Sequence, residues 1–129
     1  MGLEALALTD RNGLYGIVRF AEAARAIGLP TVFGAELQLD SGSLVIIARN
    51  PRGYAHLSSA ISAGQLAGSK EHPVFVLEQL GEFSVGDWWV MTGGRDGAVV
   101  RALNEQGPSA AERRVQQMNT VFGNDSVLM

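Results

Sequence analysis

Residues 5–13 read ALALTDRNG, an apolar run that ends in the polar residues Thr9 and Asp10. A short apolar run bounded by polar residues is typical of a buried parallel strand, which we expect near residues 4–9. Apolar side chains then recur at helical spacing, and this periodicity predicts a helix over residues 12–28. The segment therefore indicates the first half of a strand–helix–strand unit.

The second strand of this unit is expected at residues 31–39, and it carries Glu36 toward its C-terminal end. Asp10 and Glu36 would then lie at the carboxyl ends of neighbouring parallel strands. In parallel α/β folds this edge of the sheet binds ligands and metals. Asp10 has a second interpretation, because an aspartate at such a junction commonly caps the following helix, here near Asn12.

The rest of the chain continues the alternation, which predicts an α/β fold with a mostly parallel sheet flanked by helices. The tight turn at residues 40–43 predicts that a strand at 44–48 runs antiparallel to the second strand. Ser109 and Glu112 form a capping-box pattern for the last helix. Further strands are expected near residues 88–92 and 126–129, and further helices begin at Pro51, Val76 and Ala98.

The composition is that of one small globular domain of 129 residues, with 47% hydrophobic and 18% charged residues. The chain has no cysteine, which excludes disulfides and thiolate metal sites. Its net charge of −3 argues against a dedicated nucleic-acid-binding surface. We expect no membrane segment and no signal peptide, and hence a cytoplasmic protein.

Four segments resemble one family and follow its order along nearly the whole chain. The resemblance is to the PHP (polymerase and histidinol phosphatase) domain at the start of bacterial family-C DNA polymerase alpha subunits, of the error-prone, translesion type. It implies that residues 1–129 are a single partial domain of a (β/α)₇-type barrel. The first βα unit and the C-terminal barrel units would be missing. The four segments read ALALTDRNGLYGIVRFAEAARAIGLPTVFGAEL, IIARNPRGYAHLSSAIS, WWVMTGGRDGAVVRAL and GPSAAERRVQQMNTVFGNDSV.

The resemblance also implies a metal site that has lost most of its ligands. The family's Thr-Asp-His motif ends here in Arg11, and a guanidinium has no lone pair for a cation. Gly94 stands where polymerase relatives often carry a cysteine ligand, and the His-x-His strand is missing. Glu36 matches a ligand position and remains a candidate, as does His72 in a polar loop. The vestigial metal-site positions are therefore Asp10, Arg11, Glu36 and Gly94, and no catalytic residue is assigned.

Several of these residues have structural alternatives. Arg11 could replace the cation and pair with Glu36 or Asp10, or it could point to solvent. The glycine-rich segment 93–97 could bind phosphate, or it could form a tight turn that needs positive φ. His56 is expected at the surface of its helix.

Three functions follow as hypotheses. The first is the non-catalytic PHP-domain portion of an error-prone DNA polymerase alpha-type subunit. Its partner would be the rest of that subunit, it would meet DNA only through the parent, and the parent would use Mg²⁺. The second is a metal-dependent phosphoesterase or 3′–5′ exonuclease. For this function the resemblance implies Zn²⁺ or Mn²⁺ as the cofactor, as in active relatives. The third is a free-standing small binding protein that dimerises to bury its open barrel edges. No cofactor is expected for the fragment itself.

Overall fold

The computed structural model describes residues 2–129 and contains a five-stranded sheet with helices around it. The strand order in space follows the chain, from β1 to β5. The strands are β1 (Leu6–Arg11), β2 (Thr31–Leu39), β3 (Gly42–Ala48), β4 (Trp88–Met91) and β5 (Val127–Leu128). The helices are α1 (Ile17–Ala26), α2 (Pro51–Ala67), α3 (Leu77–Ser84), α4 (Ala98–Gln106) and α5 (Pro108–Phe122).

The sheet is mostly parallel, as the sequence predicts. β1 pairs with β2 in parallel, β4 pairs with β5 in parallel, and β3 is antiparallel to both of its neighbours. Four of the five strands therefore run in one direction and β3 alone runs in the other. The expected hairpin after residue 39 is confirmed, and the strand expected at 126–129 joins this sheet beside β4.

One face of the sheet carries the hydrophobic core. Along β2 the odd-numbered residues Ala35, Leu37 and Leu39 are buried, while Glu36 and Gln38 are only half-buried. This alternation follows from the period of two residues in a strand. The core side chains that are fully or almost fully buried on this face and on the helices against it include Leu37, Leu44, Ile46, Leu57, Leu80, Trp88, Val90 and Met118.

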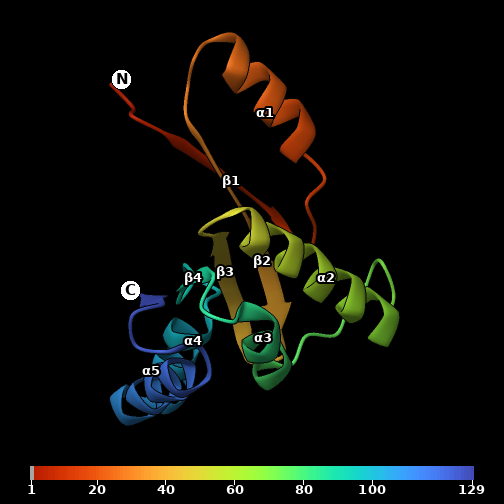
Figure 1. Ribbon diagram of the computed structural model, residues 1–129. Helices are drawn as coiled ribbons and strands as arrows, with labels where there is room; N and C mark the ends of the chain where they lie inside the picture. Colours follow the sequence, from red (N-terminus) through yellow and green to blue (C-terminus); the bar gives the residue numbers. More distant parts are fainter. Residues whose placement is uncertain (1) are drawn as a thin grey trace.

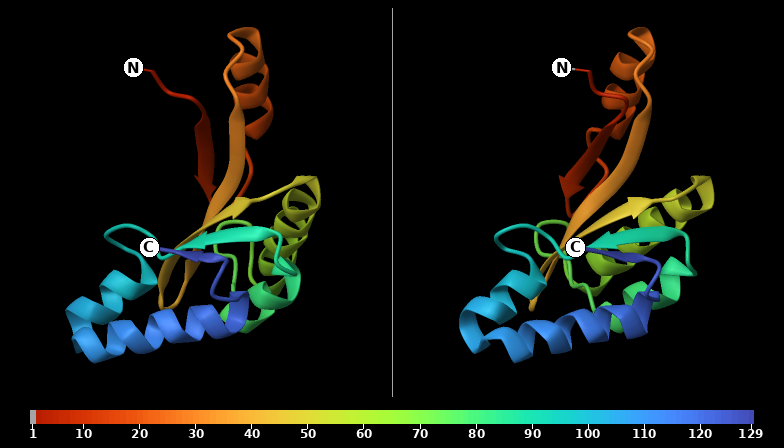
Figure 2. Two further views of the ribbon diagram at one scale, coloured as in Figure 1. Left: turned by 60° about the vertical axis from the view of Figure 1, so that its left-hand side comes forward. Right: turned by 90° about the vertical axis from the view of Figure 1, so that its left-hand side faces the viewer.

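The first quarter of the chain projects from the rest of the molecule. In Figure 1 the helices α2 and α3 lie against the sheet near β2 and β3, while α5 lies beside the C-terminal strand and α4 packs against α5. Figure 2 shows from two further sides that β1, α1 and the start of β2 form an arm above this body. We call β1, α1 and residues 31–33 the N-terminal arm.

The start of α1 corrects the expected helix over residues 12–28. Asn12 has a left-handed backbone with φ of 53°, so residues 12–16 form turns and the helix begins at Ile17. β1 also extends further than expected, to Arg11, because its ladder with β2 continues to the pair Arg11 and Glu36. Asp10 and Arg11 therefore lie within the strand instead of after it.

The start of α5 corrects the predicted capping box. Gly107 is the N-cap residue and Pro108 is the first helical residue, so Ser109 already lies inside the helix. Proline suits this first position, because its missing N–H would have no partner within the helix. α2 begins as expected at Pro51, and the side chain of Asn50 caps it by accepting the N–H of Gly53 at 2.8 Å.

The adjacent residues Trp88 and Trp89 point to opposite sides of β4, as expected for neighbours in a strand. Trp88 is fully buried, whereas Trp89 is half-buried beneath the guanidinium of Arg49, whose carbon lies 3.9 Å from the ring centroid. None of the helices in residues 2–129 has the length and apolar character needed to cross a membrane.

Candidate functional site

The vestigial positions predicted from the sequence gather where β1 and β2 end. The parallel register places Asp10 opposite Ala35 and Arg11 opposite Glu36. Because the two strands run in the same direction, their carboxyl ends share one edge of the sheet, where α/β folds bind their ligands. Asp10, Arg11 and Glu36 are therefore neighbours in the fold although residues 12–35 separate them in sequence.

Asp10 bonds to the backbone just before α1. Its Oδ2 accepts a hydrogen bond from the backbone N–H of Gly16 at 2.5 Å, and Gly16 is the N-cap residue of α1. The carboxylate thus satisfies an N–H at the start of this helix, where a negative charge is also favourable. The predicted cap of a helix near Asn12 is wrong, because α1 begins at Ile17 and Asp10 instead accepts the N–H of Gly16, the residue before the helix.

Asn12 locks the ends of the two strands together. Its backbone N–H donates to the carbonyl of Glu36 at 2.8 Å, and its side-chain Oδ1 accepts the N–H of Gln38 at 2.8 Å. The side-chain oxygen of Asn12 thereby accepts the N–H that a backbone carbonyl would accept if the pairing of β1 and β2 continued. Asparagine tolerates the left-handed backbone that this geometry needs. Sequence reasoning missed this role, although the Asn12-Gly13 pair is a recognisable turn signal.

Arg11 forms a hydrogen bond with an amide instead of a carboxylate. Its Nη2 donates to Oε1 of Gln38 at 2.8 Å. Among residues 2–129, no carboxylate oxygen lies within 4.0 Å of its guanidinium. Of the two alternatives for Arg11, the ion pair with Glu36 or Asp10 is therefore not formed within residues 2–129, and the exposed head group bonds to Gln38.

Within residues 2–129, Glu36 and His72 do not meet at a common point with further metal donors. Glu36 is half-buried on β2, where its neighbours across the sheet are Arg11 and Val45. His72 is exposed in the loop after α2 and lines a pocket of about 490 Å³ together with Arg11 and Asn12. His72 and Arg11 therefore line the same pocket, whereas Glu36 is not among the residues that line it.

Gly94 lies in the loop between β4 and α4, and this loop is a tight turn. Gly93 has φ of 81°, and a Cβ on it would lie 2.7 Å from the Cα of Gly97 and 2.8 Å from the carbonyl oxygen of Ser43. Gly94 itself is exposed, and a Cβ there would meet nothing within 4 Å. A tight turn therefore accounts for the glycine at position 93, which has a positive φ and no room for a Cβ. Position 94 has room for a side chain.

The donor set does not fit a catalytic metal cluster. In the part of the chain that the structure describes, no three residues of the types His, Asp, Glu and Cys come together as a group that could hold an ion. Two-metal phosphoesterase sites need a larger set of such ligands. Arg11 also places a fixed positive charge at this edge of the sheet.

A second polar cluster, which sequence reasoning missed, joins the start of α2 to the turn before β4. The carboxylate of Asp87 is almost fully buried and accepts hydrogen bonds from Arg52 Nε at 2.6 Å and from Asn50 Nδ2 at 2.8 Å. These bonds lower the pKa of Asp87 to about 2, and the bond from Arg52 has the largest effect. His56 lies at the margin, with its Nδ1 3.9 Å from Asp87 Oδ2 and its side chain one-third exposed. The cluster fixes α2 on the sheet.

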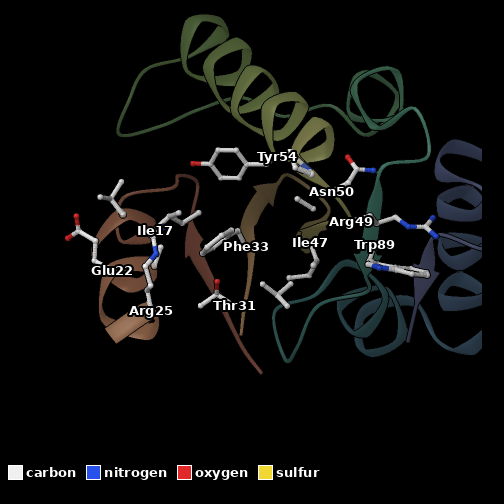
Figure 3. Close-up of a pocket in the computed structure, with 15 residues that line it drawn as sticks. Ile17, Glu22, Arg25, Thr31, Phe33, Ile47, Arg49, Asn50, Tyr54 and Trp89 are labelled. Atoms are coloured by element: carbon white, nitrogen blue, oxygen red, sulfur yellow. The ribbon is translucent and has the colours of Figure 1, made fainter. Parts of the chain in front are cut away.

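A further, mainly apolar cavity lies elsewhere, between the N-terminal arm and the body. Figure 3 shows Phe33 at its centre, Tyr54 reaching in from α2, and Ile47 and Trp89 on the far side. The rings of Phe33 and Tyr54 meet edge-to-face with centroids 6.3 Å apart. This groove of about 810 Å³ is mainly apolar and lies at the amino end of β2, away from Arg11.

Comparison with known proteins points to one family. A model of the PHP domain matches residues 1–129. An error-prone DNA polymerase of Mycolicibacterium paratuberculosis is 44% identical over 135 aligned residues, which cover 95% of this chain and 12% of that protein. One from Cutibacterium acnes is 40% identical and covers 100% of this chain and 12% of its own length, and one from Corynebacterium efficiens is 51% identical over 72% of this chain.

A solved structure from Bifidobacterium adolescentis, provisionally assigned as a metal-dependent phosphoesterase, aligns with 51% of this chain and 24% of its own. The sequences are 27% identical there and the TM-score is 0.40, which does not establish a common fold. The family match and the polymerase relatives, by contrast, extend over all or nearly all of the chain. The chain therefore belongs to the PHP domain family.

Proposed function

We propose that this chain is the PHP-domain portion of an error-prone DNA polymerase alpha-type subunit and that it acts as a non-catalytic scaffold. The chain spans about 12% of the length of the polymerases it resembles. The remainder of the subunit would carry out template-directed synthesis across damaged DNA, and it would do so in the cytoplasm with Mg²⁺. That remainder would be the main partner of the chain and would provide its access to DNA.

The observation that carries the scaffold proposal is the bond between Arg11 and Gln38. A guanidinium occupies the position of a metal ligand, and its orientation is fixed by a neighbouring amide at 2.8 Å. A cation nearby would be repelled, since two unit charges about 4 Å apart interact by roughly 4 kcal/mol at an effective dielectric of 20. Asp10, the adjacent acid, accepts the backbone N–H of Gly16 before α1.

The two open edges of the sheet support the proposal of a partial barrel. Within the described residues β1 pairs only with β2, and β5 pairs only with β4. We infer that the preceding βα unit and the later barrel units of the parent pair with these edges. Unpaired edges are a liability that proteins normally cover, so a larger assembly is the natural context for this sheet.

The test uses the full polymerase that contains these residues. We expect Arg11→Ala and Glu36→Gln to leave primer extension across an abasic template site unchanged. Leu37→Ala should lower the melting temperature, because truncating a fully buried leucine costs about 2–5 kcal/mol. Activity should fall in that variant only at temperatures where unfolding begins. Metal-dependent hydrolysis of DNA that Glu36→Gln abolishes without a change in melting temperature would contradict the scaffold role.

A further inference from the structure

The first residues of β2 have a partner strand on one side only, within residues 2–129. Residues 31–33 pair with residues 6–8 of β1. The ladder between β2 and β3 begins later, at the pair Gly34 and Ile47. Figure 2 shows β2 continuing into the N-terminal arm while β3 leaves it toward α2. Residues 31–33 therefore form a free strand edge between the arm and the body, which we call the inner edge.

The backbone of the inner edge directs N–H groups away from β1. Pro30, just before β2, accepts the N–H of Leu6 at 3.1 Å, so even-numbered residues of this stretch turn their backbone groups toward β1. Successive residues of a strand turn theirs to opposite sides, so Thr31 and Phe33 direct their N–H groups away from β1. In residues 2–129 no loop or turn carbonyl accepts either N–H. A free edge of this kind can pair with a further strand.

The groove between the N-terminal arm and the body opens beside the inner edge. Residues 31–33 all line this groove of about 810 Å³. Val18 of α1 lines it on the arm side and is 68% exposed, while Ile47 and Tyr54 line it on the body side (Figure 3). A free backbone edge next to apolar hollows is the combination that binds an extended peptide as an added strand. A helix could not use this edge, because its own backbone groups bond to one another.

The charges of the groove favour an acidic segment. Its lining contains Arg25, Arg49 and Glu22, and these two positive charges and one negative charge leave a net charge of +1. Within residues 2–129, neither arginine has a carboxylate oxygen within 4.0 Å. The carboxylate of Asp87, close to Arg49 in the fold, is paired with Arg52 at 2.6 Å, so this pair adds no net charge. A carboxylate on an incoming segment would be attracted to the arginines, whereas a lysine would be repelled.

We propose that an extended, acidic and apolar segment of the remainder of the polymerase subunit adds to the inner edge as a short strand. Its backbone would bond to Thr31, an apolar side chain would enter the groove, and a carboxylate would lie near Arg25 or Arg49. This inference rests on the proposed function, in which this chain is about 12% of a longer polymerase. The added strand would also hold the N-terminal arm against the body.

The first test is an NMR titration of the ¹⁵N-labelled chain with the blocked peptide Ac-Val-Glu-Val-Glu-Val-NH₂ as the probe. We expect saturable shifts of the amides of Thr31 and Phe33 and of the indole N–H of Trp89, which also lines the groove. The same peptide with methylated backbone nitrogens cannot donate to the inner edge and should bind at least about fivefold more weakly. A peptide with lysine in place of glutamate should also bind more weakly, because the arginines repel it.

Two variants test the groove and the inner edge separately. Val18→Asp places a carboxylate in the apolar wall of the groove and should weaken binding of the glutamate peptide by about fivefold or more. Thr31→Pro removes a donor from the inner edge without removing an N–H that pairs with β1. Arg19→Gln is the control, because Arg19 is an exposed residue of α1 outside the groove and its loss changes the net charge as Val18→Asp does. Since Val18 is already exposed, Val18→Asp keeps the test valid if Thr31→Pro fails to fold.

Hydrogen exchange in the full polymerase identifies the source of the strand. The amides of Thr31 and Phe33 should exchange at least about tenfold more slowly there than in the isolated chain, and Val18→Asp should remove this protection. The proposal is overturned if the peptide does not saturate, if Arg19→Gln weakens binding as much as Val18→Asp does, or if exchange is equally fast in the full polymerase. Failure of the scaffold role has a different readout, which is DNA hydrolysis that Glu36→Gln abolishes.

Discussion

Arg52 Nε donates to Asp87 Oδ2 at 2.6 Å, and this pair ties the first turn of α2 to the turn before β4. Its Nη2 also reaches Asp87 Oδ1 at 3.1 Å, so the contact is a bidentate one. The arginine is largely exposed and the carboxylate is almost fully buried, so the carboxylate depends on its partners for hydrogen bonds. The stability of the fold should therefore depend on the ionisation of Asp87.

Asp87→Asn should change how stability varies with acid pH. The hydrogen bonds from Arg52 and Asn50 lower the folded-state pKa of Asp87 to about 2, whereas an unfolded aspartate has a pKa of about 3.9. The ionised group therefore stabilises the fold above about pH 4, and this contribution is lost as the pH falls toward 2. We expect the melting temperature of the wild type to fall over this range and that of Asp87→Asn to change much less.

Thermal unfolding followed by circular dichroism across the acid range measures this difference. Asp125→Asn is the matched control, because Asp125 is an exposed aspartate in a turn. An acid profile of Asp87→Asn that runs parallel to that of the wild type would show that Asp87 is not the group responsible.

Gly53→Ala should destabilise the domain even though alanine normally favours a helix. A Cβ on Gly53 would lie 2.3 Å from the backbone carbonyl oxygen of Asp87, so α2 would have to move away from the sheet. Such a shift also disturbs the bond from Trp88 Nε1 to the carbonyl of Gly53, which is 2.8 Å long and buried. We expect a loss of about 1–3 kcal/mol in the free energy of unfolding, measured by urea denaturation.

Gly94→Ala is the control for this substitution, because a Cβ there meets nothing within 4 Å. Its free energy of unfolding should stay within about 0.5 kcal/mol of the wild type. A stable Gly53→Ala variant would indicate that α2 can shift at little cost.

Much of the fold could be predicted because local signals bracket its elements. Pro30 and the turn after Leu39 enclose β2, and the observed strand, Thr31–Leu39, agrees with the predicted one. The start of α1 could not be predicted in the same way. It depends on the left-handed backbone of Asn12 and on a hydrogen bond from Gly16 to Asp10, and neither is encoded in helical periodicity.

The shared sheet edge of Arg11 and Glu36 was predicted, but the contacts of these residues were not. Parallel pairing of two recognisable strands was enough to bring Arg11 and Glu36 to one edge. The bond from Arg11 to Gln38 could not be predicted, because the position of Gln38 depends on its hydrogen bond to Asn12. These two residues are 26 positions apart in the chain. The cluster around Asp87 was missed for a similar reason, since it joins residues 35 and 37 positions apart.

The isolated 129-residue chain should self-associate through the free edge of β1. Within the described residues β1 has one neighbour, and Leu3 and Leu6 near this edge are 55% and 41% exposed. A second copy can add its own edge strand and cover these side chains. Light scattering at tens of micromolar should give the mass of a dimer.

Ala7→Lys, which places a charge on the exposed face of β1, should yield a monomer, because edge lysines oppose strand pairing. Ala63→Lys on the exposed side of α2 should leave the dimer intact. A wild-type chain that stays monomeric and soluble at these concentrations would contradict the prediction.

Arg11→His restores the residue that the family's Thr-Asp-His motif would carry, and it should not restore metal-dependent catalysis. The imidazole would replace a fixed positive charge, so repulsion of a cation would decrease. The surrounding donors would still be too few. Asp10 would remain engaged with the N–H of Gly16, and at most Glu36 or His72 could join the new ligand.

Calorimetry with Mn²⁺ and Zn²⁺ and a phosphodiester hydrolysis assay test this variant. We expect weak metal binding and no turnover, because tight catalytic sites take at least about three protein ligands and two-metal sites take more. The double variant Arg11→His with Glu36→Ala is the control, and it should bind metal no better than the wild type. Micromolar binding of two ions by Arg11→His, with turnover that Glu36→Ala removes, would show that this edge retains a complete metal site and that its arginine alone suppresses the chemistry.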